Sequence, residues 1–363
     1  MPRAVARPLL QTLFSGYVSE GPRAKEFEAG FQQWVGNPNT ALVNSGTSAL
    51  TLALRLAGVG PGDEVVSTPM TCLASNEPIA GAGAKPVWSD VEPDTGNVSP
   101  DSVAEHITER TKAIMAVDWA GMPIDLDRIN HIASQHGIPV IEDAAHALGA
   151  TYRGKKIGSH SSLVCFSFQA IKHLTTVDGG AVACNRPEVY ARAKLLRWFG
   201  LSRERRRSTV DWEGEVTEPG YKMHMNDVNA TLGLVQLKYV DRIVRKHKEN
   251  ATFLRKALRN VPNLELLRVA RHAQPSYWIF TLKLPDAKAR VAFSEALLGR
   301  GVENGVAHLR NDGYALFQSS RKEALPGLDD FSSRMLNIPC GWWLTEKQRA
   351  YVADAVEKTA RAL

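Results

Sequence analysis

Apolar residues along the first two thirds of the chain follow two alternating spacings. In stretches such as 47–58 they recur every three or four positions, which is typical of a helix that buries one face. Short continuous apolar runs such as 138–145 lie between these stretches and are typical of buried strands. Strands that alternate with helices predict an α/β fold, with a mostly parallel central sheet covered by helices on both faces.

The same pattern divides the chain into elements and two domains. Strands are predicted over residues 64–68, 85–91, 112–120, 138–145, 162–168, 180–185 and 277–284. Helices are predicted over residues 26–36, 47–58, 71–83, 100–107, 126–137, 187–200, 290–301 and 346–363. One long helical pattern, 228–258, looks like a connection between domains. We therefore predict a large domain over residues 1–245 and a smaller C-terminal α+β domain over residues 246–363.

The composition is that of a globular protein with a large core. Hydrophobic residues make up 44% of the 363 residues and charged residues 23%. The net charge of +6 does not require a nucleic acid partner and suits an anionic small molecule. No stretch approaches the roughly 20 apolar residues of a membrane span, and the N-terminus lacks the apolar core of a signal peptide. The four cysteines form no C-x-x-C pair, so we expect reduced thiols and a cytoplasmic location.

Two ionisable residues stand near the ends of predicted strands. Asp143 ends the apolar run 138–143, and open α/β sheets bind ligands outside the carboxyl ends of their strands. A carboxylate there can pair with a protonated ring nitrogen, although such acids also bind metals or only aid solubility. Lys172 lies between an apolar strand and the glycines of 179–180, and lysine is the residue that forms Schiff bases with carbonyl cofactors. Each residue alone remains ambiguous.

Small polar residues close to these two can bind a phosphate. Gly46 and Thr47 open the predicted helix 47–58, and a helix start offers unpaired amides and a positive dipole end. Ser167, five residues before the lysine, can add its hydroxyl. Pyridoxal phosphate (PLP) needs a lysine for its aldehyde, an acid for its pyridine nitrogen and donors for its phosphate. The features together therefore predict a PLP enzyme, although each alone does not.

Several motifs in order resemble those of the nucleotide-sugar aminotransferases of the DegT/StrS group. The matching stretches are EGPRAKEFEAGF, NSGTSALTLAL, GAKPVWSDVEPDTGNV, GMPIDLDRI, IPVIEDAAHALGA, FSFQAIKHLTTVDGG and MNDVNATLGLVQL. The resemblance runs from about Gly16 to at least Asp241, and more loosely to the end of the chain. It implies the aspartate aminotransferase fold (PLP-dependent transferase fold type I) and a homodimer whose active sites lie at the subunit interface.

The resemblance also implies a role for each matching residue. Lys172 is expected to hold PLP as a Schiff base, the internal aldimine, and to shuttle a proton. Asp143 is expected to pair with the pyridine nitrogen, and His146 to lie beside the cofactor ring. The residues expected to take the phosphate are Gly46, Thr47 and Ser167. No metal is predicted in this site.

Three positions depart from the family's pattern. An aromatic residue that stacks on the PLP ring is common at the position of Cys72. The lysine is commonly followed by TTGEGG, whereas this chain reads TTVDGG, with Val177 in place of a glycine. A GYNxR-type segment commonly reaches the neighbouring subunit's cofactor phosphate, whereas this chain reads GYKMHMND. Lys222 and His224 stand where asparagine and arginine are common, and Asn226 is a substitute donor.

Two other groups are candidates for substrate contacts. The four arginines within 203–207 form either a solvated basic loop or a site that attracts a substrate diphosphate. The segment that carries His308, Arg310 and Tyr314 can contribute contacts from the small domain.

The leading hypothesis is an aminotransferase. An amino acid, expected to be glutamate, converts PLP to pyridoxamine phosphate, which then aminates the keto group of a nucleotide-linked deoxy sugar, with C4 favoured over C3. The second hypothesis is a PLP-dependent sugar dehydratase of the same fold. Such relatives have histidine in place of the lysine, so Lys172 argues against it, although His173 adjoins the lysine. The third is a regulatory relative without catalysis. The sugar, the nucleotide and the pathway stay open.

Overall fold

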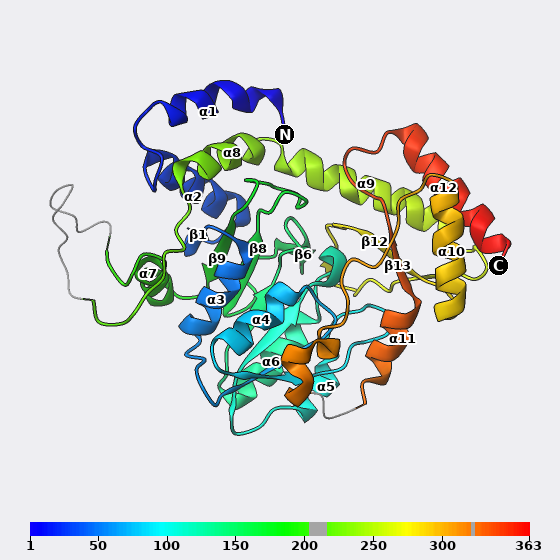
Figure 1. Cartoon of the computed structure of the whole chain (residues 1–363), viewed down its shortest axis with the longest axis horizontal. Helices are drawn as coiled ribbons and strands as arrows, with labels where there is room; N and C mark the ends of the chain where they lie inside the picture. Colours follow the sequence, from blue (N-terminus) through cyan, green and yellow to red (C-terminus); the bar gives the residue numbers. More distant parts are fainter. Residues whose placement is uncertain (203–215, 321–323) are drawn as a thin grey trace.

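A seven-stranded sheet forms the centre of the larger part of the structure (Figure 1). The computed structural model describes residues 1–202, 216–320 and 324–363. In sheet order, the strands are β1 (Thr40–Val43), β9 (Gly180–Cys184), β8 (Leu163–Ser167), β5 (Val140–Asp143), β4 (Thr111–Val117), β2 (Glu64–Ser67) and β3 (Lys85–Trp88). From β8 to β3 the neighbouring strands are parallel, and β9 is antiparallel to both of its neighbours. The mostly parallel α/β sheet predicted from the sequence is confirmed.

Helices cover both faces of this sheet because successive strand residues point to opposite faces. In β5, Val140 belongs to one hydrophobic core and Ile141 to another. The helices that contribute to the first core include α2 (Pro22–Val35), α5 (Pro100–Glu105) and α6 (Leu126–His136). Those of the second core are α3 (Gly46–Leu56), α4 (Leu73–Gly81) and α7 (Pro187–Leu196). The strand ends that carry the candidate site therefore lie on a sheet buried on both faces.

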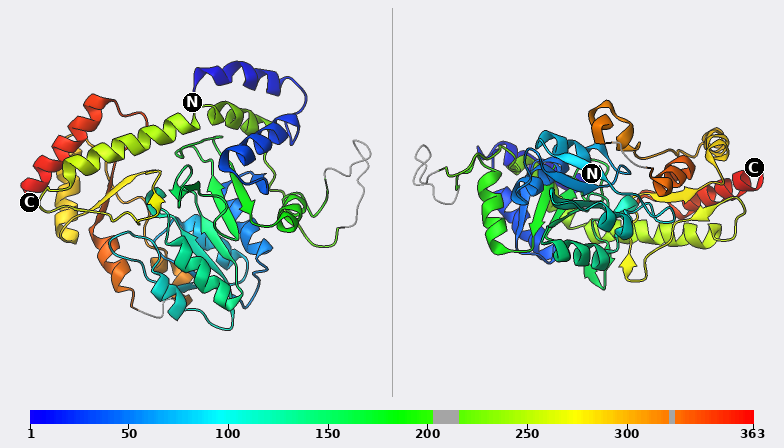
Figure 2. Two further views of the ribbon diagram at one scale, coloured as in Figure 1. Left: turned by 180° about the vertical axis from the view of Figure 1, so that it is seen from behind. Right: turned by 90° about the horizontal axis from the view of Figure 1, so that it is seen from below.

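The C-terminal part has a small antiparallel sheet of its own, beside the large sheet (Figure 2). Its strands are β10 (Glu265–Leu266), β12 (Phe280–Lys283) and β13 (Met335–Ile338). The main helices around it are α10 (Ala287–Gly299), α11 (Pro326–Arg334) and α12 (Glu346–Arg361). A third sheet joins β11 (Ala273–Gln274) to β6 (Thr151–Tyr152) and β7 (Lys155–Lys156). This third sheet holds the segment before β12 against the large part.

The long helix predicted over 228–258 is wrong in one respect, because the chain forms two helices there. α8 (Asp227–Leu237) and α9 (Val240–Leu258) are separated at Lys238 and Tyr239. α8 lies against α1 (Ala6–Leu13) and α2, whereas the second half of α9 contributes Ala251, Leu254 and Leu258 to the C-terminal core. The two helices bury different faces in different surroundings, so the chain changes direction between them.

The N-terminal helix α1 (Ala6–Leu13) was not predicted. Pro8 obscures it in the sequence, but a proline in the first turn of a helix costs little because the amide it lacks has no helical partner there. The helix is fixed by a hydrogen bond of 2.8 Å between the buried hydroxyls of Thr12 and Thr231 in α8. The short 3₁₀ turns of the chain are η1 (Arg3–Val5), η2 (Trp119–Gly121), η3 (Asn311–Gly313) and η4 (Ala315–Ser320).

Within the described residues, no helix is both long and apolar enough to cross a membrane. The domain boundary predicted near residue 245 falls within α9 and stays a prediction.

Candidate active site

Lys172 lies in the loop between β8 and β9, with its amine directed into the protein. Burial lowers the pKa of Lys172 to about 8, although the nearby charges of Asp143 and Cys72 oppose this shift. A lysine with such a pKa has a substantial neutral fraction at pH 8, and the neutral amine is the form that attacks a carbonyl. The Nζ atom lies 3.8 Å from the centre of the Trp278 ring. The structure thus places a reactive amine beside an acid and an aromatic face.

Asp143 ends β5 and is held in place by two hydrogen bonds. Its Oδ2 accepts from the Ser75 hydroxyl at 2.6 Å, and its Oδ1 accepts from the Ala145 amide at 3.1 Å. Burial raises the pKa of Asp143, whereas the bonds from Ser75 and Ala145 and the charge of Lys172 oppose that rise. Ser75 was missed in the sequence. The only signal there was a group of small polar residues inside the helix 71–83, which includes Thr71, whose hydroxyl lies 2.7 Å from that of Ser75.

Gly46 and Ser167 lie directly against each other. Ser45 caps α3 by accepting a hydrogen bond from the Ser48 amide, so Gly46 begins the helix. A Cβ atom added to Gly46 would lie 2.8 Å from the Ser167 Cβ, which is closer than van der Waals contact allows. Only glycine permits this approach of the helix start to the end of β8. Thr47 is exposed beside it, so the structure brings the three predicted phosphate-binding residues together.

His146 is buried and stacks on Trp278, with ring centres 4.0 Å apart and an interplanar angle of 17°. Its Nε2 lies 3.4 Å from the Nε2 of His308, which comes from the C-terminal part. Burial lowers the pKa of His308 to about 4 and, with the charge of Lys172 as the next cause, holds the pKa of His146 well below its usual value. Both imidazoles are therefore neutral at pH 7, and one donates to the other. His146 Nδ1 has no partner among the described residues.

The residues that depart from the family's pattern lie as follows in the structure. Cys72 stands at the N-cap position of α4 without a side-chain capping bond, and it is the one free cysteine of the four that is not buried. Val177 has a φ of +71°, a backbone conformation that suits glycine and strains a β-branched residue. Lys222 lies over the Trp198 ring at 4.7 Å, and His224 lies 3.4 Å from the Ser19 hydroxyl. The Asn226 side chain caps α8.

The other candidates have partners elsewhere, are exposed, or fall outside the described residues. His173 Nε2 lies 3.2 Å from the Ser276 carbonyl oxygen, so this buried imidazole serves the loop's structure and does not replace Lys172. Arg310 forms ion pairs with Asp312 and Asp329, which occupies the guanidinium that we expected to contact substrate. Tyr314 is exposed. The four arginines within 203–207 fall outside the residues that the structure describes.

Two buried carboxyl groups lie behind Asp143. Desolvation by burial raises the pKa of Asp118, with the charge of Glu142 as the next cause, and burial raises the pKa of Glu142 to about 7. Glu142 Oε2 accepts from the Ser161 hydroxyl at 2.7 Å, and Asp118 Oδ1 accepts from the Ile124 amide at 3.0 Å. Their other oxygens meet no donor among the described residues. Two buried carboxylates whose charges repel each other favour protonation of one of them, so the pair retains one proton.

Replacing Asp118 with asparagine is expected to remove a pH dependence of stability. In the wild type, both pKa values lie above those of unfolded carboxyl groups. The pair therefore stabilises the fold fully below about pH 4 and loses that contribution as the pH rises through about 7, an effect of about 1–3 kcal/mol. An asparagine amide donates to Glu142 at every pH. Urea unfolding at pH 5 and pH 8 measures the difference, and equal pH dependence in both proteins would contradict the shared proton.

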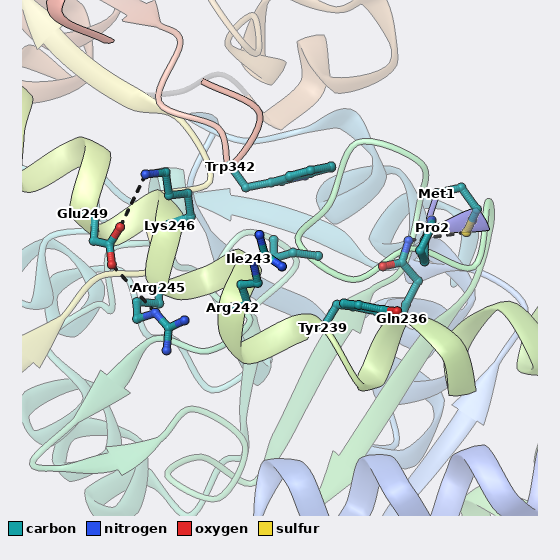
Figure 3. Close-up of a pocket in the computed structure, with 10 residues that line it drawn as sticks. All are labelled: Met1, Pro2, Gln236, Tyr239, Arg242, Ile243, Arg245, Lys246, Glu249 and Trp342. Atoms are coloured by element: carbon teal, nitrogen blue, oxygen red, sulfur yellow. Dashed lines mark hydrogen bonds and ion pairs between the residues drawn. The ribbon is translucent and has the colours of Figure 1, made fainter. Parts of the chain in front are cut away.

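A cavity of about 490 Å³ lies at the junction of α8 and α9 and involves none of these residues (Figure 3). Its walls include Trp342, Tyr239 and the first two residues of the chain. Of its cationic side chains, Arg245 and Lys246 are both ion-paired with Glu249. This cavity therefore does not combine a desolvated amine with a buried acid, whereas the site around Lys172 does.

The Lys172 group fits the cofactor that the sequence implies. It supplies an amine with a pKa of about 8 and a buried carboxylate held by two donors. The close approach of Gly46 to Ser167 forms a small cradle at a helix start, which favours phosphate. The Nδ1 atom of the buried His146 has no hydrogen-bond partner among the described residues. These residues match the aldehyde, the ring nitrogen and the phosphate of PLP.

Comparisons with known proteins find similar sequences and structures. The sequence profile of the "DegT/DnrJ/EryC1/StrS aminotransferase family" matches residues 4–357. The spore coat polysaccharide biosynthesis protein SpsC of Bacillus subtilis is 36% identical over 341 residues, covering 91% of this chain and 87% of that protein. The sugar aminotransferase CalS13 of Micromonospora echinospora has a TM-score of 0.93 and 38% identity, covering 99% and 97% of the two chains. The structure named "Putative sugar aminotransferase Spr1654 from Streptococcus pneumoniae, PMP-form" has a TM-score of 0.93 and 26% identity, covering 100% and 98% of the two chains.

Proposed function

The chain belongs to the DegT/DnrJ/EryC1/StrS aminotransferase family, and we propose that it moves an amino group from an amino acid to the keto group of a nucleotide-linked deoxy sugar. The observation that carries this proposal is the half-buried Lys172 amine within range of the charge of the buried Asp143 carboxylate. A desolvated amine with a pKa of about 8 beside a hydrogen-bonded carboxylate is the arrangement that an aminotransferase needs. The structural likeness to sugar aminotransferases supports the substrate class.

The residues of this chain have separate tasks in that reaction. PLP, when bound, supplies an electron sink and carries the amino group between the two substrates. Lys172 holds the cofactor and moves a proton at its Nζ, which its lowered pKa allows near neutral pH. Asp143 carries the negative charge that balances a protonated ring nitrogen, and Ser75 fixes its orientation. Gly46, Thr47 and Ser167 bind the phosphate, and His146 orients the ring from its side.

Finer features of the function are also proposed. Glutamate is the amino donor, and C4 of the sugar is the position that is aminated. The enzyme acts in the cytoplasm as a homodimer, in which Lys222 and Asn226 reach the partner subunit's cofactor phosphate. The exposed apolar side chains of the segment 13–18 support an interface beside these residues, because contiguous exposed apolar surface marks association sites. The boundary between the large and the small domain is also proposed to lie near residue 245, within α9.

The test uses the purified full chain loaded with pyridoxamine phosphate. Nucleotide-linked deoxy sugars with a ketone at C4 or at C3 are added, and the return of the PLP absorbance is followed while mass spectrometry identifies the amino sugar. We expect conversion of a C4 ketone and no conversion of the matched sugar with a hydroxyl at C4. Glutamate should convert the PLP form back. Failure of every ketone, together with failure of glutamate, would overturn the proposal.

A further inference from the structure

The indole of Trp278 is fixed at three points around Lys172. Its backbone amide donates to the Ala120 carbonyl oxygen at 3.0 Å, and its indole N–H donates to the Ile171 carbonyl oxygen at 2.9 Å. The ring also stacks on His146. The second bond is to the residue directly before the lysine, so Trp278 positions the lysine loop as well as its own ring.

The chain brings Trp278 here from more than 100 residues away. The segment before it is paired to β6, and Ser276 donates its amide to the Gly121 carbonyl oxygen at 2.9 Å. Gly121 has a φ of +89°, and a Cβ there would lie 2.7 Å from both the His146 carbonyl oxygen and the Ser276 hydroxyl. Glycine is required at this point so that the turn before β12 can approach the site. Trp278 is therefore held firmly in place and is buried, with 8% of its surface exposed.

The Lys172 amine lies against the face of this fixed ring. The Nζ atom is 3.8 Å from the ring centre, well inside the distance of roughly 6 Å at which the negative face of an indole attracts a cation. The attraction exists only for the charged nitrogen, and burial opposes that same charge. The ring face is thus a third feature, beside the charges of Asp143 and Cys72, that counteracts the desolvation of the amine.

We propose that the indole face of Trp278 is a holding site for the charged nitrogen of Lys172, which makes Trp278 a positioning residue for the lysine's proton transfers. The proposal rests on the function of Lys172 proposed above, but the property it concerns is measurable without turnover. Trp278 acts through Lys172 and by its ring face. Its hydrogen bond to Ile171 is a second, separable contribution.

The same protein contains a matched control. Lys156 Nζ lies 3.9 Å from the centre of the Trp34 ring, and burial lowers its pKa too. Lys156 contacts the Trp34 carbonyl oxygen at 2.9 Å and lies 3.9 Å from the Asp241 carboxylate, which is far more exposed than Asp143. This second lysine over a tryptophan, outside the active site, shows what an indole face contributes to a lysine pKa in this chain.

The experiment measures the pKa of both lysines in the full-length protein stripped of cofactor. Trace acetic anhydride labels the amines at a series of pH values, and peptide mass spectrometry gives the midpoint for Lys172 and for Lys156. Trp278→Leu should lower the Lys172 midpoint by about 0.4–1.5 pH units and leave Lys156 unchanged. Trp278→Phe, which keeps an aromatic face but loses the indole N–H, should give a smaller shift. Trp34→Leu should lower the Lys156 midpoint only.

Two results would overturn the proposal. One is a Lys172 midpoint in Trp278→Leu that is unchanged or raised. The other is an equal shift in Trp278→Phe and Trp278→Leu, which would assign the effect to the lost bond to Ile171. Circular dichroism on each variant confirms that it is folded before labelling. Failure of the sugar reaction leaves these midpoints interpretable, so the two proposals fail separately.

Discussion

Replacing Lys172 with alanine is expected to lower turnover by about 10⁴-fold, the upper range of what one acid–base group contributes. The loss has two causes, because the variant lacks both the amine that holds the cofactor and the base that moves the proton. The buried carboxylate and the phosphate cradle remain, since neither Ser75 nor Gly46 depends on the lysine for its contacts. We therefore expect the variant to bind cofactor without the visible absorbance of the wild type.

Two variants separate this expectation from a general effect of removing a lysine. Lys172→Arg keeps the positive charge beside Asp143 but is never neutral near pH 8, so it should be as inactive as the alanine variant. Lys156→Ala removes a half-buried lysine over a tryptophan outside the Lys172 site and should keep wild-type turnover. Steady-state rates with glutamate and a keto sugar measure all three. Substantial turnover in Lys172→Arg would refute the role of a neutral amine.

The sequence was sufficient for the parts of the site whose chemistry is visible in single residues. Lys172 and Asp143 stand at strand ends, where an α/β sheet places its ligands, and the structure brings them within range of each other's charge. Gly46 and Ser167 were linked only by the need for phosphate donors, and the structure shows that they touch. Six of the seven strands of the large sheet were predicted because most of their residues are buried and apolar, whereas β1 (Thr40–Val43) was not predicted.

The residues that the sequence did not reveal act through contacts between distant segments. Trp278 stands in the apolar run 277–284 and looks like an ordinary strand residue, although its ring contacts Lys172 and His146. Ser75 looks like a small residue in a helix, although it donates to Asp143, 68 positions away. Arg310 was expected to contact a substrate, but in the structure it is ion-paired with Asp312 and Asp329. The spacing of apolar residues along a helix or strand indicates which face is buried, but it does not indicate which residues that face contacts.

Replacing Asp143 with asparagine is expected to lower turnover by about 10²–10³-fold, comparable to the loss of one preorganised electrostatic group in an active site. Asparagine keeps the shape and one acceptor oxygen, but it replaces the other acceptor with an amide donor and removes the charge that balances a protonated ring nitrogen. The Asp143 charge also raises the pKa of Lys172, so the variant should lower that pKa below about 8 and shift the pH profile with it. Ser75→Ala, which loses one bond to the carboxylate, should cost about tenfold.

The neighbouring residue provides the decisive comparison for Asp143. Glu142 is equally buried on the same strand, but it faces Ser161 and Asp118 and does not contact the lysine. Glu142→Gln should therefore change stability without changing turnover, whereas Asp143→Asn should change turnover and the pH profile. Equal losses of turnover in the two variants would mean that a buried negative charge in β5 matters wherever it lies. Selective loss in Asp143→Asn would show that the position of the charge, fixed by Ser75 and strand alternation, determines its effect.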